Sequence, residues 1–310
     1  RSREVHYGPE DRLLIAAPLF HCWGLINGVL GIFGARGTAI LVRRFQTEPV
    51  LDLIEAQRPT IMLGVPVMFN FMAKSPTIGE RDLASLRCVL TAAAPTPLEL
   101  IEVLRRDWKV GYAESYGLTE TSPVITTTHH TENRPGSCGR AMGDTELKVT
   151  GHAGEDLPTG SIGELWARGT AIAAGYFRRP EATAEVFTPD GWFKTGDIVR
   201  IDEEGYVYIV DRLKDMINVA GEKVYPRDVE EVLHRHPAVA DAVVVGIPDA
   251  DRGEVVKALV ALKPGCAWSA DEVIAYLKPA LASYKLPRVV EFVDAVPRSA
   301  SGKALRRLLR

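Results

Sequence analysis

The sequence predicts an α/β fold in three consecutive parts: a layered α/β sheet, a β-rich part, and a small α+β module at the C-terminal end. Three observations support this fold class. Apolar runs alternate with helical segments up to about residue 115, and turn residues separate short β-like runs from about residue 135 to 210. After residue 211, strand and helix patterns follow in the order β-α-β-β-α-β.

In the first part, unbroken apolar runs predict strands that are covered on both faces, as parallel strands usually are. These runs occupy residues 13–17, 38–42, 60–65 and 87–91. Helices are expected between them, each with a proline near its start, at residues 48–57, 66–73 and 97–107. Thr47 and Thr96 are the expected N-caps of the first and last of these helices.

The other two parts are predicted from turns and from the order of elements. Pro-Asp-Gly at residues 189–191 and Asp-Glu-Glu-Gly at residues 202–205 are expected turns between β-like runs. The C-terminal module is expected to have strands at residues 216–219, 240–246, 255–262 and 289–293 and helices at residues 226–234 and 270–281. The charged segment 211–215 (DRLKD) connects this module to the preceding part.

Composition narrows the classes of function. The 310 residues carry a net charge of −3, which argues against the broad basic surface of a nucleic-acid-binding protein. The four cysteines lack metal-ligand or disulfide spacing, so a cytoplasmic location is expected.

The apolar stretch 24–42 contains Asn27 and Arg36 and predicts a buried helix followed by a strand, not a transmembrane span. The first residues show no signal region and no Met, so we expect a chain that starts partway through a longer protein.

Three segments carry residue types suited to nucleotide chemistry. In residues 116–122 (YGLTETS), hydroxyls and backbone amides suit phosphate oxygens, and Glu120 suits a hard cation such as Mg²⁺. Asp197, at the end of WFKTGD, can accept two hydrogen bonds from a ribose diol. Lys303, in the small-residue segment SASGK, can neutralise charge on a phosphate.

Each of these residues also has a purely structural interpretation. Residues 116–122 can be a Ser/Thr-rich loop with a capping carboxylate, Asp197 a solvated residue in a hairpin, and Lys303 part of a solvated basic tail. His21 follows Pro-Leu-Phe at the end of the first predicted strand, where a histidine in apolar surroundings is more often a packed core residue. The residues alone leave these alternatives open.

Taken together, seven segments resemble the adenylate-forming superfamily, which includes acyl- and aryl-CoA synthetases, peptide-synthetase adenylation domains and beetle luciferases. The segments are APLFH (17–21), TAAAP (91–95), YGLTET (116–121), GELWARGTAIAAGYF (163–177), WFKTGD (192–197), DRLKDMINVAGEKVYPRDVE (211–230) and SASGKALRR (299–307). Each is weak alone, but their collinear order is specific and covers essentially the whole chain.

The resemblance implies a reaction in two steps. A carboxylate attacks the α-phosphate of ATP to give an acyl-adenylate, and a thiol, usually that of CoA, takes the acyl group after a small C-terminal lid domain rotates. Residues 1–213 would be the C-terminal part of the large domain and residues 214–310 the mobile lid, with the hinge at Lys214. ATP, Mg²⁺ and CoA are the implied cofactor and co-substrates.

The resemblance also implies a role for each matching residue. The adenine and acyl pocket would be formed by Tyr116, stacked on adenine, and by Ala92, Ala93, Ala94, Gly117 and, on the acyl side, His21. The implied catalytic residues are Thr119 at phosphate, Glu120 at Mg²⁺, and Lys303 between the carboxylate and the α-phosphate. The ribose would be held by Asp197 with Arg212, and CoA would be contacted by Gly221, in the thiol channel, and Lys223, at a phosphate.

Two departures from the family pattern matter. The family's Gly- and Thr-rich phosphate loop, which ends in Pro-Lys and precedes APLFH, does not occur in residues 1–310. We therefore expect this chain alone to bind nucleotide poorly or to be inactive. Ala92-Ala93 replaces the usual small-Gly pair, which is expected to narrow the pocket slightly.

The expected activity is ligation of a medium- or long-chain fatty acid to CoA, with aryl acids close behind. PLFHCWG offers no acid to pair with an amino group, and DRLKD with GEKVYP resembles fatty-acyl-CoA ligases. The alternatives are an enzyme that loads a carrier protein and a catalytically silent ligand-binding fragment. The expected partners are the carboxylic acid, ATP and CoA, with no nucleic acid, and a homodimer remains open.

Overall fold

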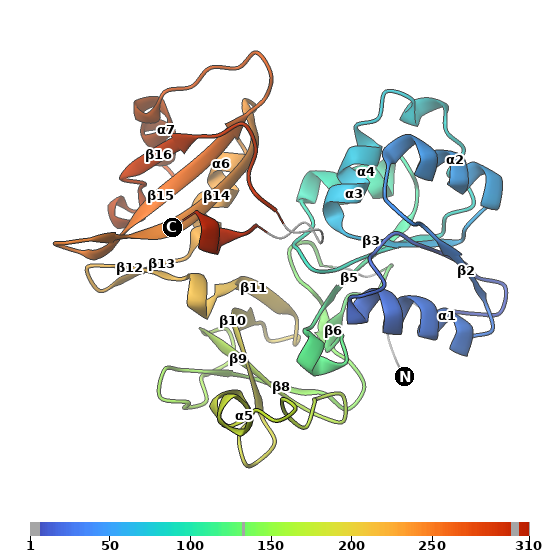
Figure 1. Cartoon of the computed structure of the whole chain (residues 1–310), viewed down its shortest axis with the longest axis horizontal. Helices are drawn as coiled ribbons and strands as arrows, with labels where there is room; N and C mark the ends of the chain where they lie inside the picture. Colours follow the sequence, from blue (N-terminus) through green and yellow to red (C-terminus); the bar gives the residue numbers. More distant parts are fainter. Residues whose placement is uncertain (1–6, 132–133, 299–303, 310) are drawn as a thin grey trace. The chain divides into compact units, whose positions relative to one another are not determined.

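The computed structural model describes residues 7–131, 134–298 and 304–309 (Figure 1). Within these ranges, no helix has both the length and the apolar character needed to cross a membrane. The chain divides into two compact units. The first is formed by residues 1–195 with 199–209, and the second by residues 196–198 with 210–310.

A seven-stranded sheet forms the centre of the first unit. Its order is β2-β1-β3-β4-β5-β6-β7, with parallel pairing from β2 to β5 and antiparallel pairing at β6 and β7. The strands are β1 (Arg12–Ile15), β2 (Thr38–Leu41), β3 (Ile61–Gly64), β4 (Cys88–Thr91), β5 (Gly111–Tyr116), β6 (Thr126–Thr127) and β7 (Arg140–Ala141). All four apolar runs predicted as strands form strands. The expectation that both faces are covered is wrong for residues 38–42, because β2 is the edge strand and its Thr38 and Leu41 are exposed.

Helices lie on both faces of this sheet, which explains why its parallel strands are apolar at successive positions. They are η1 (Trp23–Leu30, π-helical), α1 (Gly31–Gly34), α2 (Thr47–Gln57), α3 (Pro66–Ala73) and α4 (Leu98–Arg106). The last three cover one face and α1 lies on the other (Figure 1). Met62 and Val89 enter the core under α2, α3 and α4, whereas their neighbours Leu63 and Cys88 enter the core on the opposite face.

The predicted N-caps are wrong. The capping positions of α2 and α4 are Gln46 and Pro97, and neither makes a side-chain capping hydrogen bond. Thr96 is buried, and its hydroxyl oxygen lies 3.1 Å from that of Thr91 on β4. The Thr96 hydroxyl therefore bonds to the end of β4 and does not cap α4.

The helix predicted near residue 24 forms, but the prediction that it is buried is wrong for one of its faces. η1 and α1 bury Gly24, Gly28 and Ile32. Leu25, Ile26, Leu30 and Phe33 are exposed. Apolar composition predicted the element correctly, but it did not tell which of its faces the rest of this unit would cover.

The β-rich part contains a second sheet, with the strand order β11-β10-β9-β8. Its strands are β8 (Glu146–Thr150), β9 (Ile162–Arg168), β10 (Phe193–Ile201) and β11 (Val207–Arg212), and the helix α5 (Pro180–Val186) precedes β10. Both predicted turns are confirmed. The Gly205 N–H donates to the Asp202 carbonyl at 2.9 Å, and Phe187 pairs with Phe193 across residues 189–191.

The second unit contains a sheet in the order β13-β12-β15-β14, with β16 paired to β15. Its elements are β12 (Ile217–Val219), β13 (Glu222–Val224), α6 (Pro226–His234), β14 (Val239–Asp249), β15 (Gly253–Leu262), α7 (Ala270–Leu277) and β16 (Val289–Phe292). The predicted order of strands and helices is confirmed, and β13 is an additional strand. Val229 and Leu233 of α6 and Val273 of α7 share one core with the sheet.

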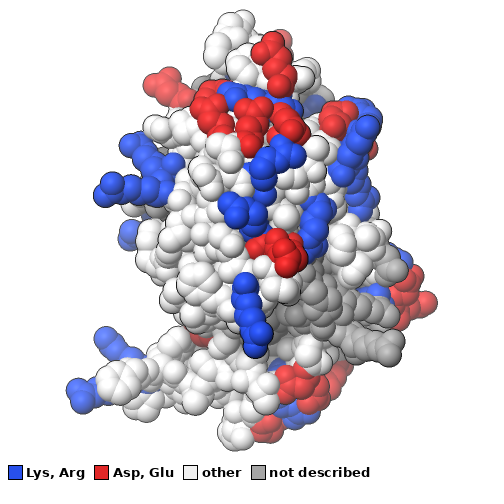
Figure 2. Space-filling view, turned by 90° about the vertical axis from the view of Figure 1, so that its right-hand side faces the viewer, with Lys and Arg blue, Asp and Glu red and all other residues white. Residues whose placement is uncertain are grey.

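Charges of both signs are interspersed over the described surface that Figure 2 shows. One cluster in the first unit has Arg81 at its centre, with ion-pair distances of 2.8 Å to Glu48, 2.6 Å to Asp52 and 2.9 Å to Glu55. Because acids and bases alternate in this way, function is better sought in local sites than in a broad electrostatic field.

Asp211 fixes the start of α6 to the end of β11. Its carboxylate accepts hydrogen bonds from the backbone N–H of Arg212 at 2.7 Å and of Arg227 at 3.0 Å. Arg227 lies in the first turn of α6, where backbone N–H groups have no partner within the helix. Burial raises the pKa of Asp211 to about 6.

We expect Asp211 to make the stability of the second unit depend on pH. Its folded pKa of about 6 lies above the usual value of 3.8, so its stabilising contribution is complete below about pH 4 and is lost as the pH rises through 6. Asp211→Asn should not show this loss. Urea unfolding should therefore show the wild type losing up to about 3 kcal/mol relative to the variant between about pH 4 and pH 8. A constant difference over that range would contradict this account.

Candidate active site

Two neighbouring parallel strands bring the predicted nucleotide loops to one edge of the sheet. β4 pairs with β5 so that Thr91 lies opposite Glu114; residues 92–94 follow β4 directly, and residues 116–121 begin at the last residue of β5. The carboxyl edge of a parallel sheet is where α/β folds bind ligands. Ala92 and Tyr116 are buried there, whereas Ala93 and Ala94 are exposed.

A buried hydrogen-bond network holds the ends of β4 and β5 together. Thr91 Oγ1 donates to Tyr112 Oη at 3.3 Å, and the Tyr112 hydroxyl donates to the Glu114 carboxylate. Burial, reinforced by the Glu114 charge, raises the pKa of Tyr112 above its usual range, which keeps the hydroxyl a donor.

Ala93, just beyond β4, has a φ of 74°, which costs a residue with a Cβ about 1 kcal/mol. The Ala-for-Gly departure in the sequence therefore has a backbone consequence as well as the expected steric one.

The loop after β5 folds tightly through the short helix η3 (Thr119–Thr121). Gly117 lies so close to the following chain that a Cβ there would be 1.9 Å from the Pro123 carbonyl oxygen. Thr119 is exposed, and its Oγ1 lies 3.7 Å from the Sγ of Cys22. This contact brings the segment that follows β1 to the same loop.

His21 belongs to that segment and is exposed. Its ring centroid lies 4.7 Å from that of the exposed Phe20. The interpretation of His21 as a packed core residue is therefore wrong, and its role at the acyl substrate stays a prediction.

Glu120 is held by a segment to which sequence reasoning gave no role. The Tyr176 hydroxyl donates to Glu120 Oε1 at 2.7 Å, and the Ala173 N–H donates to the Glu120 carbonyl at 2.8 Å. Burial and the hydrogen bond to Glu120 raise the pKa of Tyr176 to about 12, so this hydroxyl keeps its proton at neutral pH. The carboxylate predicted to meet a cation is thus fixed in place.

Asp197 and Arg212, predicted together at the ribose, lie together in the second unit. Arg212 Nε lies 2.9 Å from Asp197 Oδ1, on the neighbouring strands β10 and β11. The Asp197 side chain is 3% exposed and the Arg212 side chain 39%. The cation thus offsets the cost of burying the carboxylate.

The predicted hinge and CoA residues follow one another along the connector and first hairpin of the second unit. Lys214 is exposed in the short helix η4 (Leu213–Asp215), directly after β11. Gly221 lies at the exposed turn between β12 and β13, and Lys223 is exposed on β13, opposite Asn218. Gly221 has a φ of 93°, and its N–H donates to Asn218 Oδ1 at 2.9 Å.

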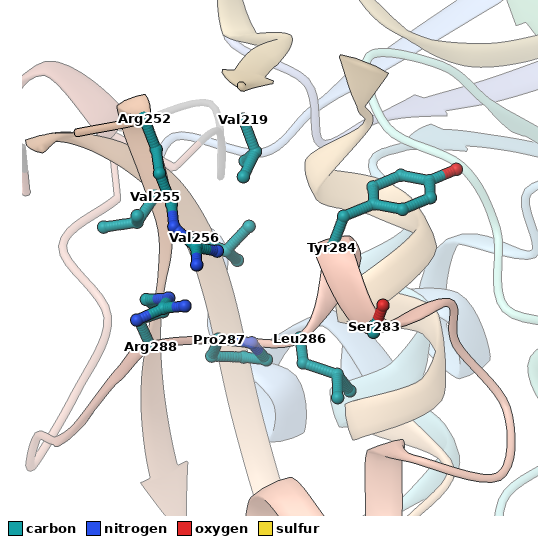
Figure 3. Close-up of a pocket in the computed structure, with 9 residues that line it drawn as sticks. All are labelled: Val219, Arg252, Val255, Val256, Ser283, Tyr284, Leu286, Pro287 and Arg288. Atoms are coloured by element: carbon teal, nitrogen blue, oxygen red, sulfur yellow. The ribbon is translucent and has the colours of Figure 1, made fainter. Parts of the chain in front are cut away.

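A cavity of about 180 Å³ lies beside this hairpin in the second unit (Figure 3). The Ala220 N–H donates to the Arg252 carbonyl at 2.9 Å, which joins the hairpin to the cavity wall. Arg252 and Arg288 lie on one side and Tyr284 on the other. Both arginines are exposed, and neither forms an ion pair with any other residue that the structure describes. Two guanidinium groups facing one cavity favour an anion there.

Lys303 lies outside the described residues, and the chain on either side of it is firmly held. Arg298 pairs with Ala304 in an antiparallel bridge, and the Leu305 N–H donates to the Pro297 carbonyl at 3.0 Å. Arg306 Nη2 lies 2.7 and 2.8 Å from the two carboxylate oxygens of Glu230 on α6. The described ends of the Lys303 segment are therefore side by side on the second unit.

Sequence reasoning missed Tyr176, Arg252 and Arg288. Tyr176 stood in a family-like segment, but no local pattern linked it to Glu120. Both arginines are placed by β15. Arg252 directly precedes this strand, and the Arg288 N–H donates to the carbonyl of Val256 in it at 2.8 Å. No spacing rule in the sequence reports such a contact.

Comparison with known proteins agrees with this architecture. The family model described as AMP-binding enzyme matches residues 1–177, and that described as AMP-binding enzyme C-terminal domain matches residues 228–303. A feruloyl-CoA synthase of an Amycolatopsis species is 40% identical over 305 residues, covering 98% of this chain and 62% of that protein. A fatty acid–[acyl-carrier-protein] ligase of Streptomyces coeruleorubidus, ScoC, is also 40% identical over 305 residues, covering 97% of this chain and 58% of that protein.

A solved structure shows the same fold. The crystal structure of ATP-bound MatB from Rhodopseudomonas palustris matches with a TM-score of 0.90 and 34% identity, covering 98% of this chain and 60% of that one. The chain thus spans between 58% and 62% of the length of these three proteins. Because one family model covers more than half of its residues and the relatives match almost all of it, the chain belongs to the AMP-binding enzymes, the adenylate-forming superfamily that contains the acyl-CoA synthetases.

Proposed function

We propose that this chain supplies the catalytic and acceptor-binding residues of an ATP-dependent ligase that joins a carboxylic acid to CoA through an acyl-adenylate. One observation carries the proposal: residues 92–94 and 116–121 meet at the carboxyl edge of β4 and β5, with Glu120 held in a fixed position. A feruloyl-CoA synthase and an ATP-bound enzyme among the similar proteins support it.

The proposed chemistry requires positioning and charge neutralisation rather than a protein nucleophile. In the first step, a carboxylate oxygen forms a bond to the α-phosphorus of ATP, and the bond to the bridging oxygen breaks, so pyrophosphate leaves. In the second step, the thiol sulfur of CoA forms a bond to the carbonyl carbon. The thiol proton is released and AMP leaves.

Glu120 is the proposed ligand of a Mg²⁺ ion that arrives with ATP. Its Oε1 accepts the Tyr176 hydroxyl, and no described residue donates to its Oε2. The described residues contain no group of three or more His, Cys, Asp or Glu placed to hold a metal. This fits Mg²⁺, which usually takes one or two carboxylates together with substrate phosphates. When bound, the ion would neutralise phosphate charge, while Thr119 contacts phosphate and Tyr116 stacks on adenine.

Residues of the second unit are proposed to act on both sides of the hinge, as the family resemblance implies, with Asp197 and Arg212 in the large domain (1–213) and Lys303 in the lid (214–310). Asp197, supported by Arg212, holds the ribose hydroxyls. Lys303 neutralises charge between the carboxylate and the α-phosphate during adenylation. Lys214 is the proposed hinge about which residues 214–310 move as a lid on residues 1–213 between the two steps.

The cavity beside the hairpin is the proposed site for the phosphates of CoA. Gly221 lines the proposed thiol channel, Lys223 is the proposed contact to a phosphate of CoA, and Arg252 is joined to this hairpin through Ala220. CoA carries a diphosphate and a 3′-phosphate, and arginine binds phosphate through several donors at once. Arg252 and Arg288 therefore offer a phosphate contact in a cavity that is also lined by Val219, the last residue of β12.

A medium- or long-chain fatty acid is the first expected substrate, and an aryl acid is the second. The fatty-acid ligase among the relatives supports the former and the feruloyl-CoA synthase the latter. ScoC also supports a second candidate function, in which the acceptor is the thiol of a carrier protein. The two arginines favour CoA, since its nucleotide end brings phosphates to the cavity.

The test is a panel of carboxylic acids assayed with ATP, Mg²⁺ and CoA, using a protein in which a phosphate loop is joined upstream of this chain. Acid-dependent release of pyrophosphate followed by thioester formation is expected, with fatty acids of medium or long chain the best substrates. Thioester formation on a carrier protein but not on CoA would select the second candidate. Absence of acid-dependent pyrophosphate release would overturn both.

In the same assay, Lys303→Ala should lower the rate of adenylation about 100-fold or more, because it removes a positive charge at the α-phosphate. Thioester formation from preformed acyl-adenylate should stay near the wild-type rate. Equal losses in the two half-reactions would argue that Lys303 does not have this role.

Arg252→Gln and Arg288→Gln should each raise the KM for CoA about tenfold, because a charge-assisted hydrogen bond to phosphate is lost. The KM for pantetheine, which has the thiol but no phosphate, should not change, and neither should pyrophosphate exchange. Arg235→Gln is a matched control, since Arg235 is also exposed in the second unit but does not line the cavity. An unchanged KM for CoA in both variants would remove the cavity from the CoA site.

Gly221→Ala should slow transfer of the acyl group to CoA and leave pyrophosphate exchange near normal, because the added methyl group would enter the proposed thiol channel. Gly265→Ala controls for backbone strain. Both glycines have positive φ, 93° and 79°, and a Cβ on either would meet no atom within 4 Å. Equal effects of the two substitutions on thioester formation would exclude Gly221 from the channel.

A further inference from the structure

The segment GELWARGTAIAAGYF (163–177) contacts Glu120 through two of its residues, although the proposed reaction has given it no role. The Tyr176 hydroxyl reaches the carboxylate at 2.7 Å, and the Ala173 N–H reaches the backbone carbonyl at 2.8 Å. The segment therefore restrains both the main chain and the side chain of Glu120.

Tyr176 is itself held by two contacts, one from Thr183 in the middle of α5 and one from Phe187, which follows α5. Its backbone N–H donates to Thr183 Oγ1 at 2.9 Å, and that hydroxyl donates to the Arg179 carbonyl at 2.8 Å. Its ring packs edge-on against Phe187, with the centroids 5.7 Å apart and the planes at 71°. The position of the hydroxyl is thus set by α5 and not by Glu120 alone.

We propose that Tyr176 is a positioning residue for Glu120, which holds one carboxylate oxygen so that the other, Oε2, is presented to a divalent cation bound with ATP. The inference rests on the proposed function, because the role of Glu120 toward that cation is itself proposed. The hydroxyl selects one orientation of a long, flexible side chain before the ligand arrives. The side-chain entropy lost on binding is therefore smaller.

The expected size of the effect follows from other metal sites. Removing a group that orients a metal ligand usually costs 10- to 100-fold in metal affinity. A positioning role predicts weaker cation binding and a nearly unchanged rate once the cation is saturating. A general structural role predicts instead that stability and every kinetic constant change together.

The test uses Tyr176→Phe in the complete protein, with Mn²⁺ as the probe cation. Binding of Mn²⁺ in the presence of a non-hydrolysable ATP analogue, followed by electron paramagnetic resonance, should weaken about tenfold. The Mg²⁺ concentration that gives half-maximal pyrophosphate release should rise by a similar factor, while kcat at saturating Mg²⁺ stays within about twofold. Thr183→Val, which keeps the tyrosine hydroxyl but removes its anchor, should shift both values in the same direction by less.

Tyr208→Phe is the matched control, because the Tyr208 hydroxyl also donates to a carboxylate, Asp202 Oδ2 at 3.1 Å, at the turn between β10 and β11. It should leave the binding of Mn²⁺ unchanged. Glu120→Gln separates the two proposals. If Glu120→Gln weakens the binding of Mn²⁺ but Tyr176→Phe does not, the positioning role is wrong and the proposed function stands. If Glu120→Gln has no effect either, Glu120 is not a ligand and both assignments fail.

Discussion

The parallel pairing of β4 with β5 is the constraint on which the proposed site depends. With Thr91 opposite Glu114, both strands end at the same edge of the sheet, so residues 92–94 and 116–121 leave it side by side. A shift by one residue would turn every side chain of the strand to the opposite face. The buried hydrogen bond from Thr91 of β4 to Tyr112 of β5, with Thr96 and Glu114 bonded beside it, also favours the register that apolar packing supports.

In the second unit, charged residues as well as apolar packing connect the segments on which the proposed reaction depends. Asp211, at the end of β11, binds the start of α6, and Glu230 of α6 binds Arg306 of the C-terminal tail. Glu230 also accepts the Val244 N–H of β14 at 2.8 Å. The connector, α6 and the chain beyond Lys303 are therefore linked through a few carboxylates, so a movement of α6 would be transmitted to the tail.

The sequence allowed prediction of what depends on local pattern and missed what depends on distant contacts. In the first unit, β1, β3 and β4 were predictable because their buried runs are almost entirely apolar, and the edge strand β2 was predictable from its apolar composition. The capping assignment failed because the Thr96 hydroxyl bonds to Thr91, and β13 was missed because two of its three residues are exposed. The pairing of Asp197 with Arg212 was anticipated only through the family resemblance. Tyr176 and Glu120 come from separate segments, so their contact could not be predicted from the residue pattern of either segment.

The most direct test of the account is photolabelling with 8-azido-ATP in the presence of Mg²⁺, followed by mass spectrometry of the labelled peptides. If the edge of β4 and β5 binds adenine, the label should fall on residues 92–96 and 116–121, and excess ATP should prevent the labelling. Protectable labelling confined to other parts of the chain would contradict the account, whatever activity the protein shows.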